Sequence, residues 1–133
     1  MRYFISYRHN GADPARLHDL QHAIKNTLDA KGDTFYSTYF RQQEYANKQL
    51  KDDASVLRHA LHRIVDYDTV LAVVDSAELS TGMLIEFGYC VAIEKPILLF
   101  IQKDITAPYS FALANKTIQY TDLNDLQNKL RLL

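Results

Sequence analysis

Hydrophobic and polar residues along the chain follow two periods, one typical of strands and one typical of helices. Short apolar runs of strand length occupy residues 2–7, 33–38, 69–75, 96–101 and 117–121. The segments between them repeat apolar residues every three or four positions, which predicts helices over residues 14–32, about 49–66, from residue 80 onward, near 109–114 and over 122–133. The two kinds of element alternate from one end of the chain to the other.

Strict alternation of strands and helices predicts a parallel sheet with helices on both faces. The run at 69–75 is almost entirely apolar, as expected for a strand that is buried on both sides. We therefore expect an α/β, three-layer flavodoxin-like or Rossmann-like domain with a five-stranded parallel sheet, formed by residues 1–133 as a single domain. Ligands of such sheets bind at the carboxyl ends of the strands, where the loops 6–11, 36–44, 75–82 and 102–110 would meet.

Composition narrows the class of protein without naming a function. A formal net charge of −1 gives no broad attraction to nucleic acid or to an anionic membrane, so neither partner is expected. The single cysteine, Cys90, cannot form a disulfide within the chain, and no apolar run reaches the roughly 18 residues that span a bilayer. These features predict a cytoplasmic protein.

The loop after the first strand, "SYRHNG", carries polar groups suited to an anion. It supplies the hydroxyl groups of Ser6 and Tyr7, the cation Arg8, the imidazole of His9 and a flexible Gly11. Backbone N–H groups near a helix start, together with an arginine, suit a phosphate or a carboxylate. The glycine patterns of dinucleotide and Walker-type sites are missing, and a loop that only caps the following helix remains the alternative.

The segment "STGMLIEFGYCVAIEKP" (residues 80–96) places a charge inside an apolar helix. Ser80 or Thr81 can cap the helix, and Gly82 allows a ligand to approach the backbone. Glu86 lies on the same apolar face of the helix as Met83. An ionised carboxylate there is energetically costly unless it pairs with another group or serves a function. We expect the helix dipole to favour its ionised form, which a carboxylate nucleophile needs. The alternative is a partly exposed glutamate paired with Arg8 or a lysine.

The five histidines do not form a recognisable metal site. His59 and His62 are three positions apart and His18 and His22 four, but neither pair occurs with a zinc motif or a cysteine cluster. No G-x-S-x-G motif points to a serine hydrolase. No metal and no cofactor is therefore expected.

The quoted helix and the strand after it, "STGMLIEFGYCVAIEKPILLF", resemble the signature of the nucleoside 2-deoxyribosyltransferase family, and "RYFISYRHNG" resembles the family's first strand and loop. The resemblance implies cleavage of the N-glycosidic bond of a nucleoside or nucleoside 5′-monophosphate, with Glu86 as nucleophile and Tyr3 orienting it. It also implies that Ser80 contacts the 5′ end of the substrate, and that Ser110 does so from a second copy in a homodimer. A serine at position 80 can donate to a phosphate, which favours a nucleotide substrate.

One position departs from the family pattern. The aspartate that the family places before the third strand, beside the nucleobase, corresponds to Ala60, with His59 and His62 as polar neighbours. A histidine could protonate the departing base, since its ordinary pKa lies near neutrality. Asp75, at the carboxyl end of the third strand, is a further candidate for contact with the substrate.

Two other functions remain open from the sequence. "YFISYRHNGADPARL" also resembles the first box of TIR domains, whose enzymatic members cleave NAD with a glutamate. That reading lacks support around Glu86, where TIR domains place a tryptophan that this chain does not contain. The second alternative is a non-catalytic nucleotide-binding module that keeps the fold.

Overall fold

A computed structural model describes residues 1–78, 80–106 and 109–133, with the backbone alone at 109 and 110. Five strands form one sheet: β1 (Arg2–Tyr7), β2 (Thr34–Tyr36), β3 (Thr69–Val74), β4 (Ile97–Gln102) and β5 (Lys116–Tyr120). The helical elements are α1 (Pro14–Lys31), η1 (Thr38–Phe40), α2 (Gln42–Asn47), α3 (Asp53–Ile64), α4 (Thr81–Ala92), η2 (Tyr109–Leu113) and α5 (Leu123–Arg131).

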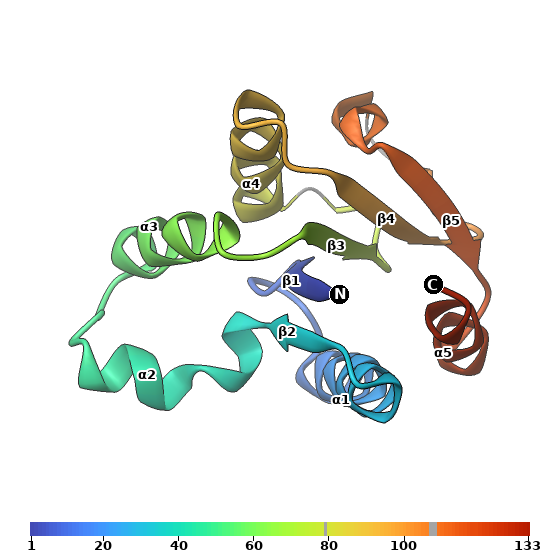
Figure 1. The fold of residues 1–133 in the computed structure, drawn as a ribbon, viewed down its shortest axis with the longest axis horizontal. Helices are drawn as coiled ribbons and strands as arrows, with labels where there is room; N and C mark the ends of the chain where they lie inside the picture. The colour runs from blue at the N-terminus through green and yellow to red at the C-terminus, as the bar shows by residue number, and fades with distance from the viewer. Residues whose placement is uncertain (79, 107–108) are drawn as a thin grey trace.

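The sheet is entirely parallel, with strand order β2-β1-β3-β4-β5. Helices α1 and α5 cover one face, and α3 and α4 cover the other (Figure 1). This confirms the predicted three-layer α/β fold with a five-stranded parallel sheet. The chain leaves β1 toward β2 and leaves β3 toward β4, so the order reverses between β1 and β3, where ligands of such sheets bind.

Helix α1 begins and ends where its sequence predicts. The Asp13 carboxylate accepts a hydrogen bond from the backbone N–H of Arg16 at 3.0 Å, and Pro14 occupies the first helical turn. Gly32 ends the helix with a left-handed φ of 78°, which glycine adopts without strain. Leu17, Leu20, Ile24 and Leu28 form one stripe of this helix, which is buried and packs against β1 and α5.

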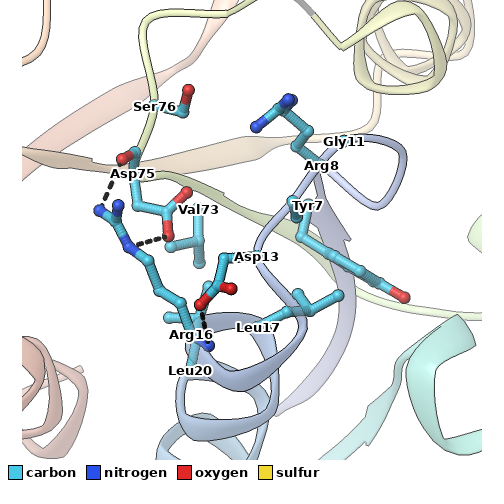
Figure 2. Close-up of a pocket in the computed structure, with 11 residues that line it drawn as sticks. Tyr7, Arg8, Gly11, Asp13, Arg16, Leu17, Leu20, Val73, Asp75 and Ser76 are labelled. Atoms are coloured by element: carbon cyan, nitrogen blue, oxygen red, sulfur yellow. Dashed lines mark hydrogen bonds and ion pairs between the residues drawn. The ribbon is translucent and has the colours of Figure 1, made fainter.

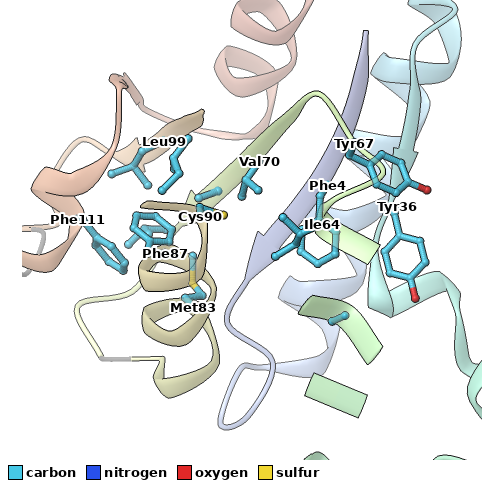
Figure 3. Packing of buried hydrophobic residues seen from close by; sticks show 14 of the residues in the cluster. Phe4, Tyr36, Ile64, Tyr67, Val70, Met83, Phe87, Cys90, Leu99 and Phe111 are labelled. Atoms are coloured by element: carbon cyan, nitrogen blue, oxygen red, sulfur yellow. The ribbon is translucent and has the colours of Figure 1, made fainter. Parts of the chain in front are cut away.

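Side chains of β1 alternate between the two faces of the sheet. Phe4 belongs to the core under α3 and α4, where its ring stacks on Tyr36 at 5.6 Å between centroids (Figure 3). Tyr3, Ile5 and Tyr7 belong to the core under α1 and α5. This parity decides which candidate residues can meet across the sheet.

The region between β2 and β3 differs from the prediction. β2 ends at Tyr36, because the Ser37 hydroxyl accepts from the backbone N–H of Tyr39 and starts the turn of η1. The sequence reading missed α2 and began the next helix too early. Gln49 has a left-handed φ of 57°, and the carboxylate of Asp52 caps the start of α3 by accepting from Ser55 N–H at 2.7 Å.

Candidate active site

Glu86 is a buried acid at the reversal point of the sheet. It projects from α4 beneath the carboxyl end of β1 and retains 8% of its surface exposed. The Ser6 hydroxyl donates to Glu86 Oε1 at 2.6 Å, a contact that joins positions 80 residues apart in the sequence. No lysine or arginine in the described part of the chain pairs with this carboxylate, so the alternative of an exposed, ion-paired glutamate does not describe the structure.

The protonation state of Glu86 differs from the expectation. Burial raises the pKa of its carboxyl to about 7, although the Ser6 hydroxyl acts in the opposite direction. Glu86 is the sixth residue of α4, beyond the first turn where the helix dipole is strongest. Desolvation therefore outweighs the dipole. Neutral and ionised forms coexist near pH 7 instead of the ionised form alone, which is the range expected of a carboxyl that must change its charge during a reaction.

Tyr3 does not contact Glu86. It belongs to the core on the α1 side of the sheet, while Glu86 and Ser6 lie on the other side. Burial raises the pKa of its phenol, with smaller contributions from Asp33 and Asp68, which lie at the amino end of the strands. The contact with Glu86 that the sequence leads us to expect of Tyr3 is therefore not present, and in this structure Ser6 makes a hydrogen bond with Glu86.

A cluster of tyrosines beside Glu86 was missed by sequence reasoning. The Tyr36 hydroxyl donates to Glu44 Oε2 at 2.9 Å and lies 3.1 Å from the Tyr45 hydroxyl. Burial raises the pKa of Tyr45, and the negative charges of Glu44 and Glu86 contribute in the same direction. Tyr45 thus lies near both carboxylates, and its ring meets that of His59 edge-on at 5.8 Å.

Glu44 and His59 form the outer part of this cluster. Burial alone would raise the pKa of Glu44, but the hydrogen bond from Tyr36 and nearby cationic groups hold it below its ordinary value. His59 Nε2 lies 3.6 Å from Glu44 Oε2, within ion-pair distance but beyond hydrogen-bond distance, and this buried atom has no hydrogen-bond partner among the described residues. His59 and the exposed His62 line an open groove of about 340 Å³ along α3.

A second cavity, of about 180 Å³, lies on the opposite side of β1 (Figure 2). Tyr7 and Arg8 line it on the side of the first loop, and Asp75 lines it at the end of β3. Arg16 Nε lies 3.2 Å from Asp75 Oδ2, so the aspartate already has a cationic partner within the chain. Glu86 is not part of the lining of this cavity or of the α3 groove.

Within the first loop, Gly11 lies close to the guanidinium of Arg8. Gly11 has a left-handed φ of 77°, and a Cβ at this position would lie 2.6 Å from Arg8 Nη2. The Tyr7 hydroxyl hydrogen bonds with Thr38 Oγ1 at 2.8 Å, and burial raises the pKa of this tyrosine to about 12. His9 is exposed, and its ring meets that of Tyr7 edge-on at 6.3 Å between centroids.

The start of α4 carries the remaining candidates. Ser80 caps the helix, as its sequence predicts, by accepting from Met83 N–H at 3.3 Å, and its own hydroxyl donates to no group among the described residues. A Cβ at Gly82 would meet no atom within 4 Å, so the space beside it is open. The side chain of Ser110 lies outside the described residues. Val91, near the end of the same helix, is 48% exposed.

Within the described ranges, no group of three His, Cys, Asp or Glu side chains is arranged to hold a metal ion. None of the helices in those ranges combines the length and the apolar content that crossing a membrane requires.

The sequence matches a model of a known protein family. A model of the nucleoside 2-deoxyribosyltransferase family matches residues 11–128, which leaves β1 and Arg8 outside the match. A comparison with curated proteins finds no match.

Solved structures share the fold. A CMP N-glycosidase of Clostridium botulinum is similar, with a TM-score of 0.73 and 18% identity over 99% of this chain and 98% of that one. A conserved protein of Enterococcus faecalis V583 has a TM-score of 0.70 and 12% identity over 99% of both chains. A 2-deoxyribosyltransferase of Bacillus psychrosaccharolyticus has a TM-score of 0.65 and 18% identity over 96% of this chain and 91% of that one.

Proposed function

The chain belongs to the nucleoside 2-deoxyribosyltransferase family, and from this premise we propose that it cleaves the N-glycosidic bond of a nucleoside 5′-monophosphate with Glu86 as nucleophile. The observation that carries the proposal is the buried hydrogen bond of 2.6 Å between Ser6 and Glu86, at the point where ligands of parallel sheets bind. A desolvated carboxylate is a stronger nucleophile than a hydrated one, and a single hydroxyl holds it in place without quenching it.

In the proposed reaction, the ionised Glu86 attacks C1′ of the sugar. The C1′–N bond breaks, its electron pair leaves with the base, and the base takes up a proton. The sugar is then held on the enzyme as an ester, which water or a second base cleaves to regenerate the carboxylate. Ser6 donates to Oε1, and Oε2 has no hydrogen-bond partner in the described ranges, so we assign the attack to Oε2.

In this proposal, the departing base is protonated by a residue of the cluster formed by Tyr36, Glu44, Tyr45 and His59. His59 is the assigned acid, because its Nε2 is buried without a hydrogen-bond partner in the described part of the chain and lies 3.6 Å from the carboxylate of Glu44. Tyr45 lies between His59 and Glu86 in this proposal, because its ring meets that of His59 edge-on and the charge of Glu86 contributes to its raised pKa. The role was considered for His59 or His62 from sequence, and the exposed His62 is assigned only to the wall of the groove.

The preference for a 5′-phosphate rests on the groups at the carboxyl edge of the sheet. Arg8 offers a cation in the first loop, and Ser80 offers a hydroxyl hydrogen at the start of α4. A structural neighbour named as a CMP N-glycosidase acts on a monophosphate, which supports the same class of substrate here.

A homodimer completes the proposal. The outer side of α4 exposes Ile85 and Val91 by 42% and 48%, and Leu113 of the neighbouring η2 is 48% exposed. The only charged residue of α4, Glu86, is buried, so this face carries no charge and suits a second copy of the chain. Sedimentation analysis should find a dimer for the wild type and a monomer for Val91→Glu; a monomeric wild type would exclude this part.

The activity can be tested with a panel of ribo- and deoxyribonucleosides and their 5′-monophosphates, followed by chromatography for the free base. We expect release from at least one monophosphate, and a loss of about a thousandfold or more for Glu86→Gln. Equal traces of base from the wild type and from Glu86→Gln would reject the proposal.

The same assay includes NAD. Release of nicotinamide without release of base from any nucleotide would favour the TIR-like alternative. Thermal stabilisation by a nucleotide without turnover would instead favour the non-catalytic module.

A further inference from the structure

The cation at the proposed phosphate site already has an anionic partner within the chain. Arg8 Nη2 lies 2.5 Å from Glu78 Oε2, although the two residues are 70 positions apart. Arg8 follows β1 directly, and Glu78 lies in the loop between β3 and α4. The ion pair therefore joins the two loops that flank the reversal point, above the helix that carries Glu86.

The two members of the pair are unequally fixed. The Arg8 side chain is only 16% exposed, and the backbone of Gly11 packs against its guanidinium. The Glu78 side chain is 73% exposed. An ion pair with one solvated member contributes little stability, so the carboxylate can leave while the guanidinium stays in position.

The other charges around the cavity are already engaged. Arg16 pairs with Asp75, and the Asp13 carboxylate caps α1. Arg8 is thus the cation of this lining whose partner is an exposed loop carboxylate. A carboxylate and a phosphate present similar oxygens to a guanidinium, so the group that Glu78 supplies resembles the group that a nucleotide would supply.

We propose that Glu78 is a specificity-determining residue. Its carboxylate pairs with the Arg8 guanidinium in the free protein and competes with the 5′-phosphate of the substrate for that guanidinium. The inference rests on the proposed function for the identity of the ligand. A nucleotide must displace the Glu78 carboxylate to reach Arg8, whereas an uncharged nucleoside leaves the ion pair intact. Glu78 therefore reduces the difference in affinity by which the protein would prefer monophosphates to nucleosides.

Ribose 5-phosphate tests this directly, because it carries the phosphate and the sugar but no base and needs no turnover. Its dissociation constant is measured by titration calorimetry, with ribose as the uncharged comparison. Glu78→Gln should bind ribose 5-phosphate about fivefold more tightly than the wild type, the range set by the worth of an exposed ion pair. Arg8→Gln should bind it more weakly than the wild type.

Glu94→Gln is the matched control. It removes the same charge from an exposed residue just beyond the other end of α4. It should leave the dissociation constant unchanged, which separates competition at Arg8 from a general change in net charge.

The outcomes distinguish this inference from the proposed function. Unchanged or weaker binding in Glu78→Gln, equal gains in both glutamine variants, or no binding of ribose 5-phosphate by any variant overturns it, even if base release is found. Tighter binding in Glu78→Gln alone sustains it, even if no base is released from any nucleotide.

Discussion

Replacing Glu86 by glutamine should make the folded protein more stable at alkaline pH, although it removes the proposed nucleophile. Burial raises the pKa of this carboxyl from 4.5 to about 7. Between these pH values the folded state keeps the proton and the unfolded state has lost it. The unfolded state then binds fewer protons, so the stability of the wild type falls as the pH rises through this window.

The size of the effect follows from the same difference. At about 1.36 kcal/mol per pH unit, a rise from 4.5 to about 7 corresponds to about 3 kcal/mol at pH 8. Only 8% of the residue is exposed, so water screens little of this penalty. Glutamine is neutral at every pH and does not incur it. Any change in the hydrogen bond to Ser6 shifts the glutamine variant by a constant amount, which the pH dependence separates.

Urea unfolding followed by circular dichroism, from pH 4.5 to 8.5, measures this difference. The free energy of unfolding of Glu86→Gln should gain up to about 3 kcal/mol on the wild type across the range. Asp104→Asn, which neutralises an exposed carboxylate, should follow the wild type. If the curves of Glu86→Gln and the wild type run parallel, Glu86 titrates like an exposed glutamate and the reasoning from burial is refuted.

Three further outcomes follow from the site. Base release should rise about tenfold per pH unit below about pH 7 and level off above it, because Glu86 must be ionised to attack; Ser6→Ala should move the inflection to higher pH, and a flat profile would contradict the assignment. Ser80→Asp should weaken monophosphate binding about tenfold or more while sparing the nucleoside, through like-charge repulsion; equal losses in a calorimetric titration would show that Ser80 does not read the 5′ end. Gly11→Ala should lower the free energy of unfolding in urea by about 1 kcal/mol, since alanine resists the left-handed φ. It should also weaken ribose 5-phosphate binding by displacing Arg8, whose Nη2 would lie 2.6 Å from the new Cβ. Unchanged affinity would show that Gly11 does not belong to the site.

The architecture was readable from the sequence because its signals are local. The β3 and β4 segments are continuous apolar runs, and each lies between helices with clear ends. Asp13 and Gly32 mark the ends of α1 through their own backbone and side-chain chemistry. Parallel strands joined by helices then leave few topologies, so the correct elements give the correct fold.

The position of Tyr3 away from Glu86 could not be foreseen from the sequence, for a physical reason that lies in β1. Both faces of this strand are covered by helices, and Tyr3, Phe4 and Ile5 are all buried. The sequence alone therefore carries no alternation to tell which residues face α4. A shift of one position changes the face of every side chain, and the tyrosine chosen by resemblance lies on the side away from Glu86. Ser6, on the correct side, was placed only in the phosphate loop.

The tyrosine cluster was missed for a different reason. Helix α2 has six residues and buries only Tyr45, too little for an apolar stripe to show. The contacts that give it meaning, from Tyr36 to Glu44 and from Tyr45 to His59, join three separate elements. Their proximity depends on the path of the chain after β2, which a left-handed residue at Gln49 and the cap at Asp52 determine.

The end of β1 divides the candidate site into two halves. Ser6 points to Glu86 on the α4 side, and its neighbour Tyr7 lines the cavity on the α1 side. A ligand that contacts both Arg8 and Glu86 must therefore lie across the edge of the sheet, between the first loop and the start of α4. The Arg8–Glu78 pair joins the same two segments in the free protein. In the two proposals, Glu86 acts on the sugar and Glu78 competes for the cation that anchors the phosphate, so one carboxylate would govern the rate of the reaction and the other would govern which molecules are held in place for it.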